Sequence, residues 1–256
     1  MSQAAFFNRF ATHWREVVAI TLAILLLIGL VLAGPIPQYI NYYLFADTRP
    51  LLGIPHFWNV LSNLPFLIVG VAGIVVCLQP HFAGARASWL VMFTGTALVC
   101  FGSGYFHWNP NSHTLAWDRL PMTFVLTGLF TAMVCEQLGV KRERYILLPA
   151  IAAGAASVAW WYWADDLRFY MWVQALPLVT IAVFFVLFRG RFTHREYLVY
   201  GLGVYILAKV AEYYDKEIYT GSGNLISGHS IKHLLAAMAL LLILTMLMRR
   251  GPSAPA

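Results

Sequence analysis

Two histidines near the carboxyl end of the chain have the spacing of a metal-binding pair. His229 and His233 lie four residues apart in the stretch SGHSIKH, so on a helix their side chains share one face. This spacing lets two imidazoles reach one Zn²⁺. A third histidine would complete three protein ligands and leave the fourth position to water, as in catalytic zinc sites.

The stretch FGSGYFHW supplies a candidate third histidine. Ser103 and His107 are four residues apart and also share a helix face. Ten residues separate His107 from Asp118, which is enough for a connection that turns an antiparallel hairpin. The Asp118 carboxylate could take a proton from a zinc-bound water, and the Ser103 hydroxyl could donate to an oxyanion. The candidate site therefore consists of His107, His229, His233, Ser103 and Asp118.

Each of these residues also has an ordinary structural interpretation. A histidine such as His107 often hydrogen-bonds a neighbour at the membrane interface, and Ser103 could be a small residue at a helix contact. Asp118 could be a carboxylate favoured by the dipole at a helix start. Three histidines, one aspartate and one serine at one expected depth on three helices favour the metal site over these separate explanations.

The elements that must position these residues are membrane-spanning helices. The chain has 256 residues, of which 60% are hydrophobic and 11% are charged, whereas soluble domains carry roughly 25% charged residues. Apolar runs of about 17–25 residues can cross a bilayer as helices. Eight such runs cover approximately 17–33, 57–78, 88–107, 118–138, 145–163, 169–188, 196–214 and 227–248. The sequence therefore predicts one all-α membrane bundle with short loops, the longest of which, 34–56, is expected to be irregular.

The loops alternate in charge along the chain. Eleven basic residues fall on one set of loops together with the termini, and three fall on the other set. This positive-inside pattern predicts a multi-pass protein of the cell inner membrane with both termini in the cytoplasm. The site residues then lie near the outer, periplasmic leaflet. Attraction to anionic lipid explains the net charge of +6, and no basic patch interleaved with aromatic residues indicates nucleic acid.

Other polar residues in the apolar runs are expected to be structural. Lys209 and Glu212 are three residues apart and are predicted to pair, which lowers the cost of burying them. Lys232 directly precedes His233, so on a helix its side chain is expected to point about 100° away from that of His233. It would then reach outward to solvent or meet Asp215 or Glu217.

Three cysteines and two further polar residues are assigned no place in the site. The cysteines lie in apolar runs without CxxC spacing, which predicts buried, inert thiols. A solvated loop position is expected for His113, and a position near the inner boundary for Glu136. The three cysteines are Cys77, Cys100 and Cys135.

Four stretches in order resemble a known family. SNLPF after FWNV, then GSGYFH, then Asp118, then HSIKH at the start of the last helix resemble the alkaline ceramidase-like membrane hydrolases of the CREST superfamily. That superfamily also includes the progestin and adipoQ receptors. The resemblance covers most of the chain, and the match is closest to bacterial members of the ceramidase or phytoceramidase type.

The resemblance implies a seven-helix core that holds Zn²⁺ through three histidines, with a serine and an aspartate nearby. The core would be 57–248, and the helix at 17–33 would be an N-terminal addition in the same single domain. Carried over position by position, the ligands are His107, His229 and His233, and the catalytic pair is Ser103 and Asp118. The eukaryotic members also bind Ca²⁺, but here His56 stands at their glutamate position and only Asp47 lies nearby, so no calcium site is predicted.

The implied activity is hydrolysis of the N-acyl amide of a ceramide-like lipid to a fatty acid and a sphingoid base, with zinc-activated water as nucleophile. The membrane lipid would be the partner, and the oligomeric state stays open. Another N-acyl lipid or a lipid ester would suit the same chemistry. The alternatives are a zinc-binding receptor or sensor without turnover, a retinal protein using Lys209 or Lys232, a haem protein, and a structural membrane protein.

Overall fold

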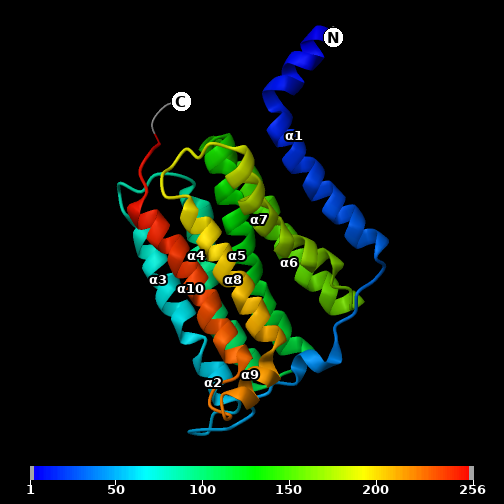
Figure 1. Ribbon diagram of the computed structural model, residues 1–256, viewed down its shortest axis with the longest axis vertical. Helices are drawn as coiled ribbons and strands as arrows, with labels where there is room; N and C mark the ends of the chain where they lie inside the picture. Colours follow the sequence, from blue (N-terminus) through cyan, green and yellow to red (C-terminus); the bar gives the residue numbers. More distant parts are fainter. Residues whose placement is uncertain (1–2, 254–256) are drawn as a thin grey trace.

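Long helices carry almost all of the apolar sequence, because within lipid every backbone polar group must find its partner inside the chain. The protein is described here by a computed structural model, which covers residues 3–253 and contains no β-strand in that range. The α-helices are α1 Gln3–Leu32, α2 Phe57–Leu61, α3 Leu64–Leu78, α4 Arg86–Trp108, α5 Ser112–Leu138, α6 Glu143–Ala164, α7 Arg168–Leu187, α8 Glu196–Tyr213, α9 Asp215–Gly221 and α10 Gly228–Arg249. The predicted all-α membrane bundle is confirmed (Figure 1).

The number of helices able to cross a membrane differs slightly from the expectation. Seven of the eight predicted runs lie in helical segments long and apolar enough to span a bilayer, within the described residues. The eighth, 196–214, forms α8, which has 18 residues and includes three charged ones. It packs along α10 inside the same bundle. The chain is therefore a multi-pass membrane protein whose α8 carries polar groups into the bundle.

Two helix boundaries near the candidate site were predicted wrongly. The run 57–78 is divided into α2 and α3 at Ser62 and Asn63. The helix expected from 118 begins at Ser112, so the connection after α4 has three residues rather than ten. Asn111 causes the early start, because its side chain accepts hydrogen bonds from the backbone at the start of α5 in a capping box. Asp118 consequently lies in the second turn of α5.

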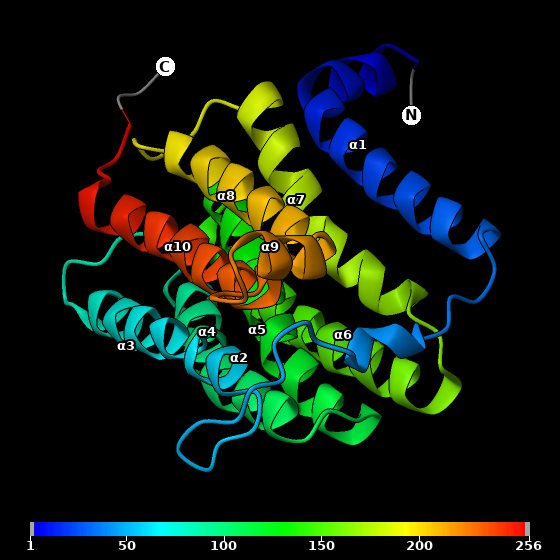
Figure 2. The ribbon, with the colours of Figure 1, turned by 60° about the horizontal axis from the view of Figure 1, so that its bottom comes forward.

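The helices that carry the site lie side by side. α4 packs against α3 and α5, and α10 packs against α8 and α3. Helix α1 stands outside this group and contacts α7, where the Trp172 indole donates to the Ala23 carbonyl at 3.2 Å. The connection before α2 crosses the end of the bundle at which α2 and α9 lie (Figure 2). The start of α1 and the end of α10 lie at the opposite end (Figure 1).

Candidate metal centre

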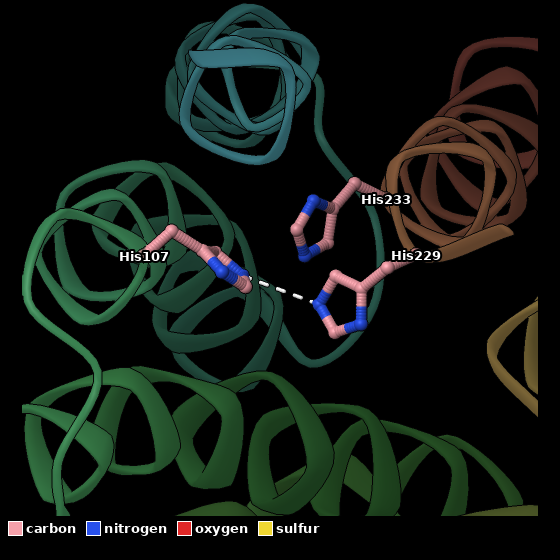
Figure 3. A group of neighbouring side chains, drawn as sticks. All are labelled: His107, His229 and His233. Carbon is pink, nitrogen blue, oxygen red and sulfur yellow. Dashed lines mark hydrogen bonds between the residues drawn. The ribbon is translucent and has the colours of Figure 1, made fainter. Parts of the chain in front are cut away.

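Three histidines from two distant segments converge inside the bundle. His107 comes from the last turn of α4, and His229 and His233 come from the first two turns of α10 (Figure 3). One ring nitrogen from each lies within 4.8 Å of those of the others, and Nε2 of His229 is 3.2 Å from Nε2 of His107. All three side chains are buried. Among the described residues, this is the one group of three or more His, Cys, Asp or Glu side chains that could hold a metal ion.

The start of α10 is fixed by hydrogen bonds that place its two histidines. Ser227 caps the helix by accepting from the backbone N–H of Ser230. The backbone N–H of His229 donates to Asp215 Oδ1 at 2.7 Å. The other oxygen of Asp215 accepts from the backbone N–H of Ala46 at 2.9 Å, so the long connection before α2 is tied to the same point.

Ser62, at the break between α2 and α3, holds the ring of His233. The Ser62 hydroxyl lies 2.8 Å from His233 Nδ1 and leaves Nε2 for another partner. Metal-bound histidines commonly use the second ring nitrogen in this way, which fixes their tautomer and orientation. Nearby, the Asn59 Oδ1 accepts from the hydroxyl of Ser230 at 2.9 Å and links α2 to α10. No role was assigned to Ser62 or Asn59 from the sequence, because neither has helical spacing to any candidate site residue. Both nevertheless lie in the stretches FWNV and SNLPF, on which the family resemblance rests.

The ring of His107 is enclosed from the side of the connection before α2. Phe45 packs edge-on against His107 and His229, with ring centroids 4.6 Å and 4.8 Å away. His56 Nδ1 lies 2.8 Å from the carbonyl oxygen of His107. Asp47, the other residue compared with a calcium ligand, is paired with Arg49 at 2.6 Å. This packing keeps bulk water away from the histidines.

The histidine donor set fits a zinc ion. Zinc binds imidazole nitrogen at about 2.0–2.1 Å in tetrahedral geometry, which places ligand nitrogens roughly 3.3 Å apart. The Nε2 atoms of His107 and His229 already have this separation, at 3.2 Å. His107 Nδ1 is buried without a hydrogen-bond partner in the described structure. Buried nitrogens facing one another need a shared proton or a cation, and three imidazoles offer a metal three neutral ligands.

Ser103 and Asp118, the predicted catalytic pair, lie at the same cavity as one of the histidines. Both are buried, and both line a cavity together with His233. The cavity has a volume of about 240 Å³ and continues between α5, α7, α8 and α10 to apolar residues such as Leu129 and Ile243. One polar end and a long apolar remainder suit a lipid chain.

Of three charged residues near the site, two make the predicted ion pair and the third has other contacts than those predicted. Lys209 and Glu212 pair as predicted. The expectation for Lys232 was wrong: its Nζ lies 2.9 Å from Glu212 and 3.3 Å from His229 Nε2, instead of pointing to solvent, Asp215 or Glu217. Glu212 on the neighbouring α8 draws it inward, a tertiary contact that spacing along α10 cannot reveal.

The remaining polar residues that were assigned no place in the site are not part of the histidine cluster. His113 is exposed at the start of α5. Glu136 pairs with Arg250 at 2.7 Å near the carboxyl end of α10. The three cysteines Cys77, Cys100 and Cys135 are buried free thiols.

Comparison with protein families gives one match. A family model described as Ceramidase matches residues 53–250, which include all three histidines, Ser103 and Asp118. A search of curated proteins found no match.

Proposed function

Because the chain belongs to the ceramidase family, we propose that it is a zinc-dependent hydrolase that cleaves the N-acyl amide of a ceramide-like lipid. The family name implies a hydrolase of amide bonds with a lipid substrate. The identity of the metal, the mechanism and the residue roles are our inference. The observation that carries the inference is the convergence of three buried histidines, one of which, His233, lines an apolar cavity.

His107, His229 and His233 would hold the zinc ion. Bound zinc would lower the pKa of a water to about 7 and polarise the amide carbonyl. Ser62 keeps the His233 ring in a fixed orientation, and Phe45 shields the site from solvent. A dry, rigid surrounding strengthens the electrostatic interactions on which the reaction depends.

Asp118 and Ser103 would carry out the proton transfer and the charge stabilisation. Asp118 takes a proton from the attacking water, whose oxygen forms a bond to the carbonyl carbon. Ser103 donates a hydrogen bond to the carbonyl oxygen as negative charge develops on it. Asp118 then gives its proton to the nitrogen as the C–N bond breaks. The products are a fatty acid and a sphingoid amine.

The cavity supports a substrate that stays in the bilayer. Its apolar walls between α5, α7, α8 and α10 would hold an acyl chain, and the headgroup would lie at the nearby interface. We further propose that 57–248 is the hydrolase core and α1 an addition to it. The protein would lie in the inner membrane with its termini in the cytoplasm and its site near the periplasmic leaflet.

Ceramide hydrolysis by the purified protein tests this proposal. Fatty acid release, followed by mass spectrometry, should stop when a chelator removes the metal and return when zinc is added. Asp118→Asn should retain zinc while turnover falls by about 10²–10⁴-fold. Release that persists in the metal-depleted protein would argue against zinc. A zinc-loaded protein that cleaves no N-acyl lipid would instead support a receptor or sensor.

A further inference from the structure

The catalytic scheme gives no role to a group of three neighbouring charged residues of the cavity wall. Lys209 and Glu212 on α8 and Lys232 on α10 all line the cavity. Glu212 pairs with both lysines. Lys232 alone also reaches the histidines, because its Nζ lies 3.3 Å from His229 Nε2. A lysine at this depth in a membrane protein marks a functional position by default.

The hydrogen-bonding capacity of Lys232 exceeds what the protein uses. An ammonium group has three N–H donors and no acceptor. Nζ forms an ion pair with Glu212 at 2.9 Å, and one donor is directed to His229 Nε2. The lone pair of that nitrogen cannot both accept a hydrogen bond and bind a metal. With His229 as a metal ligand, at least two donors of Lys232 are free at the polar end of the cavity.

Arg119 is a further cation near Lys232, and it has partners of its own. Arg119 also lines the cavity. Its guanidinium group, however, stacks on Trp161, 4.0 Å from the ring centroid, and donates to the Gln38 side chain at 2.6 Å. Of these cations, Lys232 is the one in contact with His229, and it is therefore placed to meet an oxygen of a ligand bound beside that histidine.

We propose that Lys232 binds the acyl oxygen of the lipid, which is the amide carbonyl oxygen before cleavage and the fatty acid carboxylate afterwards. The inference rests on the proposed function for the identity of the lipid. Glu212 holds Nζ in place, and the cavity leads the acyl chain from this point toward Leu129 and Ile243. A carboxylate in so apolar a space needs a cationic partner that donates hydrogen bonds.

Binding of a fatty acid to the metal-depleted protein tests the proposal without turnover and without zinc as a competing partner. A long-chain fatty acid is compared with the fatty alcohol of the same length by calorimetry. The wild type should prefer the acid by roughly 10- to 100-fold, as expected for a charged hydrogen bond. Lys232→Met should lose this preference and bind the alcohol as before. Glu212 keeps Lys209 as its partner in that variant, so no buried carboxylate is left unpaired.

Lys209→Met is the matched control, because it removes the same charge from the same carboxylate without touching His229. It should keep the preference for the acid. Equal losses in the two variants, or an unchanged preference in Lys232→Met, would overturn the proposal. If Lys232→Met loses alcohol binding as well, Lys232→Arg decides: retained preference supports the proposal, and lost preference overturns it.

Turnover of the zinc-loaded protein gives a second readout. Lys232→Met should lower kcat by about 10²–10³-fold with a smaller change in KM, because the interaction strengthens as charge develops on the oxygen. A wild type that cleaves no N-acyl lipid would contradict the proposed function. The comparison of acid and alcohol binding would still test whether Lys232 binds the acyl oxygen, because it does not depend on turnover.

Discussion

Single hydrogen bonds fix the orientation or the backbone position of two of the candidate metal-binding histidines. His233 owes its orientation to Ser62, and His229 owes its backbone position to Asp215. Neither partner is itself a candidate metal ligand, yet each restricts a ring that is. Such supporting groups commonly change metal affinity when they are removed.

Ser62→Ala should weaken zinc binding by about 10–100-fold, because His233 Nδ1 loses its partner and the ring gains freedom. Competition with a chelator of known affinity measures the change. Ser88→Ala is a matched control, since the Ser88 hydroxyl is buried without a hydrogen-bond partner. Equal zinc affinity in the wild type and Ser62→Ala would show that Ser62 does not orient the ring.

Spacing in the sequence identified the candidate ligands but not their supports. The four-residue intervals that join Ser103 to His107 and His229 to His233 are helical signals that survive folding. The partners Ser62 and Lys232 depend on how α2, α8 and α10 pack, which no local pattern records. The sequence contained these residues and placed them in helices, but it could not say which atoms they meet.

Close approach of two helices brings Ser103 to Asp118. Gly102 lies against α5, and a Cβ at this position would be 2.3 Å from the carbonyl oxygen of Trp117. Two residues further along α4, a Cβ at Gly104 would meet nothing within 4 Å. The two glycines of GSGYFH therefore have different roles, one in packing and one at an open surface.

Gly102→Ala should destabilise the protein by about 1–3 kcal/mol, because the added methyl group forces α4 and α5 apart. Gly104→Ala should be neutral or slightly stabilising, since alanine favours helix by about 1 kcal/mol over glycine. Thermal unfolding in detergent compares the two variants. Similar unfolding temperatures for both would mean that α4 and α5 are not in tight contact at Gly102.

The turn between α6 and α7 is hydrogen-bonded to the connection that follows α1. Asp166 accepts hydrogen bonds from the Arg168 side chain and from the backbone N–H of Ile36. The hydrogen bonds from Arg168 hold the pKa of Asp166 below its ordinary value of 3.8. Because the folded pKa is depressed, the carboxylate stabilises the fold fully above pH 3.8, and this contribution is lost as the pH falls toward the folded pKa.

Asp166→Asn should therefore lower the free energy of unfolding at pH 7 by about 1–3 kcal/mol, the cost of losing hydrogen bonds to a charged group. The difference from the wild type should shrink as the pH falls below 3.8. Unfolding temperatures in detergent between pH 7 and pH 3 measure both effects. A difference that is independent of pH would contradict the assigned cause.

Whole helices were easier to predict than their ends. Runs of apolar residues located the long helices because the bilayer fixes their length. The start of α5 was missed because the cap at Asn111 lies in a polar stretch that appeared to be a loop. Helix α9 was missed because it is only seven residues long and mostly polar.

At the scale of the molecule, the start of α10, which carries two of the histidines, lies at the end of the bundle opposite to the start of α1 and the end of α10 (Figure 1). With the positive-inside pattern, this arrangement predicts that both termini face the cytoplasm. Protease treatment of inside-out and right-side-out vesicles should remove a tag at either terminus only from the inside-out ones. A tag removed from the right-side-out vesicles would reverse the orientation and move the site to the cytoplasmic leaflet.

The central claim is that His107, His229 and His233 share one zinc ion. Metal analysis of the purified protein by mass spectrometry tests it most directly, with His113→Ala as a surface control. The wild type and the control should carry one zinc ion per chain, and His229→Ala should carry none. Full zinc occupancy in His229→Ala, or a folded wild type that takes up no zinc, would contradict the claim.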